Sequence, residues 1–123
     1  MKLLLVVEKD KGKIWGRITY KGNLITDYAR NMETLEKKMA KLLKDFHSIG
    51  NASFDHSYDL TVFFEQFDVL KQSKVAELAG INPGLLRQYA SGVKHPSAEQ
   101  TLKIEKAVHQ LARELQSVSL HAA

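Results

Sequence analysis

Apolar and polar positions in the N-terminal half of the chain follow the spacing of β-strands. Residues 3–7, LLLVV, form an unbroken apolar run, which predicts a strand buried on both faces and therefore placed inside its sheet. Residues 14–20 then alternate between two faces, and residues 24–28 continue as a third strand. Gly12 and Gly22 fall in the two intervening turns, where hairpins favour glycine, so the pattern predicts two consecutive hairpins.

The spacing changes to that of a helix after residue 30. Asn31 is the expected N-cap of a helix that runs to about residue 49. Its apolar stripe comprises Leu35, Met39, Leu42, Leu43, Phe46 and Ile49, and the opposite side carries Lys37, Lys38, Lys41 and Lys44. The lysine side could attract nucleic acid, but it is more typical of the solvent side of an amphipathic helix. Alternation at residues 54–58 predicts a fourth, short strand.

The C-terminal half has helical spacing throughout. Asp59 is the expected N-cap of a helix in LTVFFEQF. Further helices are predicted at residues 72–79, 83–91 and about 98–118. The fold class expected from this order is α+β, with a small β-β-β-α-β module over residues 1–58 followed by an all-helical module over residues 59–123.

The link between the second and third of these helices contains the cues of a tight helical corner. Gly80 suits the left-handed position that ends a helix, and Ile81 is expected to fill the corner. Asn82 is an expected N-cap, with Pro83 at the first helical position, where no amide hydrogen is needed. Two short helices crossing steeply over such a turn are typical of helix-turn-helix DNA-binding proteins.

Charge supports that interpretation only locally. The chain of 123 residues has a formal net charge of +4, of which the C-terminal half contributes nothing. Residues 71–96 nevertheless contain four basic residues against Glu77, a local charge of +3 that fits a surface facing phosphates. The absence of cysteine excludes disulfides and thiolate metal sites. The first apolar run is too short for a secretory signal or a membrane span, so we expect a cytoplasmic protein without a membrane partner.

Residues 72–108 resemble the Cro and phage-repressor type of helix-turn-helix, on the segments QSKVAELAGI, LLRQYASG and KHPS. The resemblance implies contacts with double-stranded DNA. It places Gln72, Asn82, Ser91 and Lys94 beside the phosphates, and Arg87 and Gln88 beside the bases. The two positions that usually begin base contact are Pro83 and Gly84, which carry no side-chain donor or acceptor. Direct readout is therefore expected one turn further along, since arginine pairs with guanine and glutamine with adenine.

The complete order of elements resembles the HicB antitoxin family, which joins a partial ribonuclease-H-like module to a DNA-binding module. The segments GINPGLLRQYASGVKHPS and KIEKAVHQLARELQSVSL are the closest to it, whereas TYKGNLITD replaces a proline- and glycine-rich stretch that many members carry. The resemblance implies a repressor of its own operon that also masks a small ribonuclease toxin of the HicA type.

Three other functions fit parts of the pattern. The chain could be a stand-alone transcriptional regulator whose N-terminal module senses a ligand or oligomerises. It could be a protein-interaction module in which the helical corner is only scaffold. An RNA-binding protein using the lysines of residues 37–44 is the weakest alternative, because the N-terminal half lacks interleaved basic and aromatic residues.

Catalytic patterns are missing from the sequence. The five histidines have no metal-ligand spacing, and Glu8, Asp10 and Asp27 are not arranged as the converging carboxylates of a two-metal nuclease. No glycine-rich phosphate loop or nucleophile motif occurs. We therefore expect no enzymatic activity, no metal and no cofactor.

The last predicted helix has more apolar positions than a single corner needs. Ile104, Val108, Leu111, Leu115 and Val118 follow a 4-3-4-3 spacing. The first two suit packing within the module. The last three predict pairing with a second copy of the chain, or alternatively cover for the N-terminal sheet. A two-fold homodimer, or a higher homo-oligomer, would set two reading helices one DNA turn apart.

Overall fold

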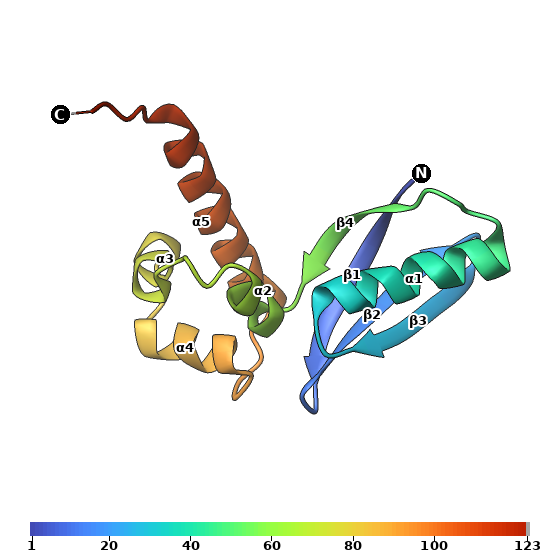
Figure 1. Ribbon diagram of the computed structural model, residues 1–123. Coiled ribbons are helices and arrows are strands. Elements are labelled where there is room, and N and C mark those ends of the chain that lie inside the picture. Colours follow the sequence, from blue (N-terminus) through green and yellow to red (C-terminus); the bar gives the residue numbers. More distant parts are fainter. Residues whose placement is uncertain (123) are drawn as a thin grey trace. The chain divides into compact units, whose positions relative to one another are not determined.

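The computed structural model describes residues 1–122 and has a mixed α+β fold with an open four-stranded sheet and five helices (Figure 1). The α+β class predicted from the sequence is confirmed. The strands are β1 (Lys2–Asp10), β2 (Lys13–Tyr20), β3 (Asn23–Ala29) and β4 (Ser53–Tyr58). The helices are α1 (Met32–His47), α2 (Leu60–Gln66), α3 (Gln72–Ala79), α4 (Pro83–Ser91) and α5 (Ala98–Ser117). No helix among residues 1–122 is both long and apolar enough to cross a membrane.

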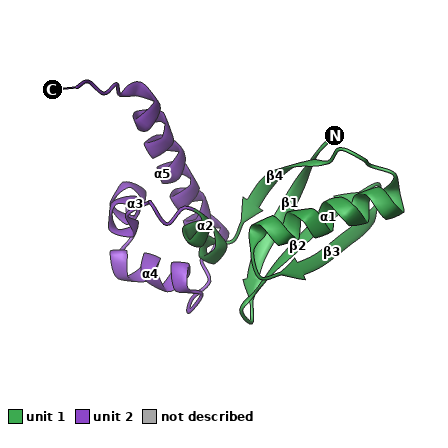
Figure 2. Ribbon diagram, viewed as in Figure 1, with its two compact units in different colours: residues 1–66 green, residues 67–123 purple. Residues whose placement is uncertain are grey.

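The chain divides into two compact units, residues 1–66 and the residues from Phe67 onward (Figure 2). The sequence placed the boundary between residues 58 and 59. In the structure α2 packs on β1 and β4 and so belongs with the sheet. Asp59 ties this helix to the sheet, because one carboxylate oxygen accepts from Val62 N at 2.8 Å and the other from Lys9 N at 2.8 Å. The predicted N-cap role of Asp59 is confirmed.

The sheet has the strand order β3-β2-β1-β4, with β1 antiparallel to β2 and parallel to β4. As predicted, β1 lies inside the sheet. The prediction that it is buried on both faces is wrong, because Leu5 and Val7 are fully buried whereas Leu4 is 54% exposed. Helix α1 lies across one face of the sheet (Figure 1), and Leu4, Trp15 and Leu24 on the other face are exposed. The sheet therefore has one covered face and one open face.

The core of the first unit forms between the covered face and α1. Leu35, Met39 and Leu43 of α1 are fully buried against Leu5 and its neighbours. Gly16 permits this close packing, because a Cβ built there would lie 3.0 Å from Leu5 Cδ1 and 3.1 Å from Leu35 Cδ2. The helix and the sheet consequently meet over a glycine.

Helix α1 begins as predicted and ends slightly earlier. The Asn31 side chain accepts from Thr34 N at 2.8 Å, which is the expected N-cap. Ser48 ends the helix with a φ of 57°, and the chain turns there so that Ile49 covers the end of the core. Phe46, which the sequence placed in the apolar stripe, is 75% exposed.

The solvent side of α1 carries ion pairs. Lys37 pairs with Glu33 at 3.1 Å, and Lys41 pairs with Asp45 at 2.8 Å. Hydrogen bonding and the charge of Asp45 raise the pKa of Lys41 above its usual value. These contacts favour the solvent-side interpretation of the lysines over a nucleic-acid surface.

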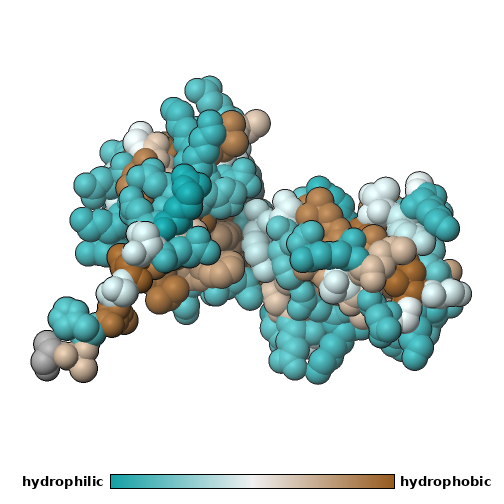
Figure 3. All heavy atoms as spheres, turned by 90° about the horizontal axis from the view of Figure 1, so that it is seen from above, coloured by the Kyte–Doolittle hydropathy of each residue, from teal (hydrophilic) through white to brown (hydrophobic). Residues whose placement is uncertain are grey.

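The second unit is built from α3, α4 and α5, with α3 packed against both of the others. Its buried residues are Val75, Ala76, Ile81, Leu86, Tyr89, Ile104 and Ala107. Ser97 caps α5 as predicted, accepting from Gln100 N at 3.1 Å. Beyond α5, apolar surface is visible along the C-terminal tail (Figure 3).

Candidate nucleic-acid interface

The corner between α3 and α4 is held by backbone hydrogen bonds and one buried side chain. Gly80 has a φ of 70°, a conformation that side chains with a Cβ rarely adopt, and its N–H donates to the carbonyls of Ala76 and Glu77. The next amide, Ile81 N, donates to Ala76 O at 2.9 Å. Ile81 itself is buried in the corner. The residue types singled out in the sequence therefore occupy the positions predicted for them.

Asn82 starts α4 with its side-chain oxygen. This oxygen accepts from Gly84 N at 2.8 Å and from Leu85 N at 3.3 Å, and Pro83 occupies the first helical position. The side chain was also predicted to lie beside a phosphate. Because its oxygen is committed to the cap, only its amide NH₂ group is left for such a contact.

Four of the six predicted contact residues line one shallow hollow on the surface of α4. The lining residues of this hollow, which we call the α4 hollow, are Gln72, Gly84, Arg87, Gln88, Ala90 and Ser91. Gln72 is brought there from the first turn of α3, and the others lie along the outer side of α4. Leu86 and Tyr89 of α4 are buried and fix which side faces out. Side chains with hydrogen-bonding groups from two helices are therefore gathered around one hollow.

Arg87 and Gln88 are both exposed, and they reach the α4 hollow from the second turn of α4. A Cβ built on Gly84 would lie 3.7 Å from Arg87 Nη2, so the guanidinium extends over the glycine. From the sequence, Gly84 was noted only for having no side-chain donor or acceptor. Its position shows a second property, because a Cβ there would lie 3.1 Å from the Asn82 Oδ1 that caps the helix.

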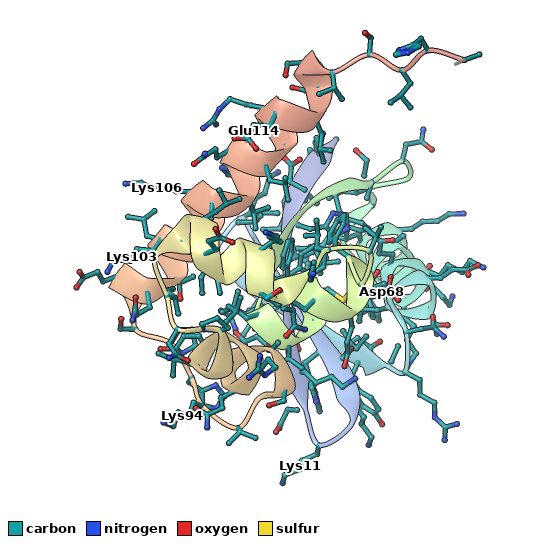
Figure 4. All side chains as sticks on the ribbon, turned by 90° about the vertical axis from the view of Figure 1, so that its left-hand side faces the viewer. Lys11, Asp68, Lys94, Lys103, Lys106 and Glu114 are labelled. Carbon is teal, nitrogen blue, oxygen red and sulfur yellow. The ribbon has the colours of Figure 1, made fainter. Side chains whose placement is uncertain are left out.

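Ser91 and Lys94 lie at the end of α4. The Ser91 hydroxyl donates to Gln88 O at 3.2 Å, so its oxygen is left as an acceptor while its hydrogen is engaged. Lys94 does not line the α4 hollow. Its backbone N–H donates to Gln88 O at 3.2 Å, which holds the following loop against the helix end, and its side chain extends outward (Figure 4).

The charge of this side is positive and largely unpaired. Lys74 pairs with Glu77 at 3.5 Å. Among the described residues, Lys71, Arg87 and Lys94 form no ion pair. Lys71, which sequence reasoning counted only toward local charge, immediately precedes α3 and Gln72. Unpaired cations beside polar side chains form a surface suited to an anionic polymer.

Metal ligation is a separate question from this surface. Within residues 1–122, no group of three or more His, Asp or Glu side chains is placed so that it could hold a metal ion. The predictions that the chain lacks a cofactor and lacks enzymatic activity stay predictions.

Comparison of the chain with family models, with curated proteins and with solved structures finds no match.

Proposed function

We propose that this chain is a sequence-specific DNA-binding repressor of the helix-turn-helix type, and that it acts as the antitoxin of a HicA/HicB-type toxin-antitoxin pair. The observation that carries the DNA-binding part is the α4 hollow, where Gln72, Arg87, Gln88 and Ser91 converge on the exposed side of a capped helix. The unpaired cations around it support the same part.

In this proposal α4 enters the major groove with its outer side toward the bases. The Arg87 guanidinium donates two hydrogen bonds to guanine O6 and N7, and the Gln88 amide pairs with adenine N6 and N7. Gln72, the NH₂ group of Asn82, Ser91 and Lys94 face the phosphates on either side and fix the register. Pro83 and Gly84 form the tip of the helix and read no base.

The test is binding to the DNA upstream of the gene, measured by fluorescence anisotropy at several salt concentrations. We expect affinity to fall steeply with added salt, because phosphate contacts release counterions. The Arg87→Ala/Gln88→Ala double variant is expected to bind all sequences alike. Arg113→Ala is the matched control, since Arg113 is an exposed arginine on α5 outside the hollow. Retained preference for the upstream site in the double variant would remove the readout assignment.

The antitoxin part rests on the likeness of the element order and of residues 80–120 to the HicB family. It predicts that a very small basic protein, encoded beside this chain, co-purifies with it and arrests growth when expressed alone. Growth should recover when both are expressed. If the neighbouring product neither binds this chain nor inhibits growth, the antitoxin part fails while the repressor part stands.

A further inference from the structure

The open face of the sheet carries apolar and aromatic side chains that the first unit leaves exposed. We define this open sheet face by the residues that alternate with the buried ones on β1, β2 and β3, together with Asp55 of β4. Its large apolar members are Leu4, Val6, Trp15, Leu24 and Tyr28. Leu4 is 54% exposed and Leu24 is 64% exposed, and contiguous exposed apolar patches often mark interaction surfaces.

The composition of the open sheet face resembles the centre of a protein–protein interface. Trp15 on β2 and Tyr28 on β3 are cross-strand neighbours whose ring centroids lie 4.7 Å apart. Arg17 lies two residues further along β2. A shallow hollow on this face is lined by Trp15 and Arg17 together with Val6 and Thr26. Tryptophan, tyrosine and arginine are the residue types most enriched among the residues that dominate binding energy.

Charges of the two signs are equal in number on the open sheet face. Lys2 pairs with Asp55 at 3.2 Å, and Arg17 pairs with Glu8 at 2.6 Å. The third cation, Lys13, has its ammonium 4.5 Å from the centroid of the Tyr28 ring, and its partner in the strand register is Asp10. A face with as many carboxylates as cations has no net charge to attract a nucleic acid or a strongly charged protein. Its occupant should carry both signs in equal numbers.

We propose that the occupant is a second copy of this chain, docked with its own open sheet face against the first. A two-fold interface brings the same patch together twice, so it requires a patch that complements itself. The open sheet face meets that requirement, because its three cations can pair with the three carboxylates of the other copy while the apolar side chains lose contact with water. This inference does not depend on DNA binding.

Trp15 supplies the experimental readout. It is the only tryptophan in the chain, and it is 38% exposed on the open sheet face. We expect its emission to move to shorter wavelength, and its quenching by acrylamide to fall, as the concentration of the full chain rises from nanomolar to high micromolar. Leu24→Lys, which places a charge on the face and leaves Trp15 in place, should weaken this self-association roughly tenfold or more.

Leu102→Lys is the matched control, because Leu102 is an exposed leucine on α5 and receives the same charge. It should behave as the unmodified chain. Three outcomes would overturn the proposal: Trp15 emission that is the same for the chain and for Leu24→Lys at every concentration, shielding of Trp15 only when a small toxin protein is added, or shielding only when DNA is added. The measurement without DNA or toxin keeps this inference separable from the proposed function.

Discussion

Gly16 sets how closely α1 approaches the sheet. A methyl group at this position would meet Leu5 and Leu35 at 3.0–3.1 Å, and both side chains are fully buried. We expect Gly16→Ala to lower the free energy of unfolding of the sheet unit by about 1–3 kcal/mol, because overpacking forces buried neighbours to shift. Urea titration followed by circular dichroism measures the change.

Gly50 is the matched control for that substitution. A Cβ at Gly50 would meet nothing within 4 Å, and its φ is not in the positive range. Gly50→Ala should therefore leave stability unchanged or slightly raise it, since alanine reduces the conformational freedom of the unfolded chain. Equal losses in the two variants would show that contact with Leu5 and Leu35 is not the cause.

We expect Arg87 and Lys94 to contribute to DNA binding in different ways, Arg87 through a base and Lys94 through the phosphates. Arg87→Ala should reduce discrimination against a changed guanine by about 1–3 kcal/mol, because one bidentate contact is lost. Lys94→Ala should weaken binding to every sequence alike and reduce the salt dependence by about one counterion. The readout is anisotropy on a panel of single-base variants of the upstream site.

Lys106→Ala is the control for Lys94→Ala, because Lys106 is an exposed lysine on α5, placed apart from Lys94 (Figure 4). A uniform loss for Arg87→Ala, or a base-specific loss for Lys94→Ala, would reverse the roles given to the two residues.

At the scale of elements, Asn82 at the N-terminus of α4 has two roles that substitutions can separate. Its side-chain oxygen caps the helix, and its NH₂ group is proposed to contact a phosphate. Asn82→Ala removes the oxygen that accepts from Gly84 and Leu85 and should cost about 1 kcal/mol of stability. Asn82→Asp keeps an equally good cap and adds a charge that repels phosphate. We expect Asn82→Asp to retain the melting temperature and to bind DNA more weakly. Unchanged DNA affinity in Asn82→Asp would place this side chain away from the phosphates.

Element ends were predictable from the sequence where one local hydrogen bond decides them. Each predicted cap accepts a hydrogen bond from the amide three residues ahead, and these caps are Asn31, Asp59, Asn82 and Ser97. Such a bond needs only a suitable side chain at a set distance along the sequence, so the sequence is enough to predict it. The αL position of Gly80 followed from the same local reasoning.

Burial and the gathering of site residues were less predictable. Leu4 and Phe46 were expected to be buried, yet which face of β1 is covered and where α1 stops are set by tertiary packing. Periodicity alone could not give the approach of Gln72 to Arg87 and Gln88, since the two helices must first pack around Ile81. The approach of Arg87 Nη2 to Gly84 has no sequence signal, because it depends on a side-chain conformation.

At the scale of the whole molecule, we propose two different surfaces for self-association. One is the open sheet face. The other is the later part of α5 and the tail, where Leu111 is half-buried and Leu115 is 61% exposed. Val118, expected to continue the stripe, lies just beyond the end of the helix at Ser117. Pairing through α5 would join the second units of two copies, which carry α4. Pairing through the sheet would instead join their first units.

Two independent surfaces predict a definite series of molar masses, measured by size-exclusion chromatography with light scattering. The full chain should form an assembly larger than a dimer, because each copy can contact two others. Leu24→Lys should leave the α5 contact and give a dimer, and Leu115→Glu should leave the sheet contact and also give a dimer. The double variant should be monomeric, and Leu102→Lys should match the unmodified chain. A monomer from either single variant would mean that the remaining surface does not hold two copies together, and a dimer from the double variant would require a third surface.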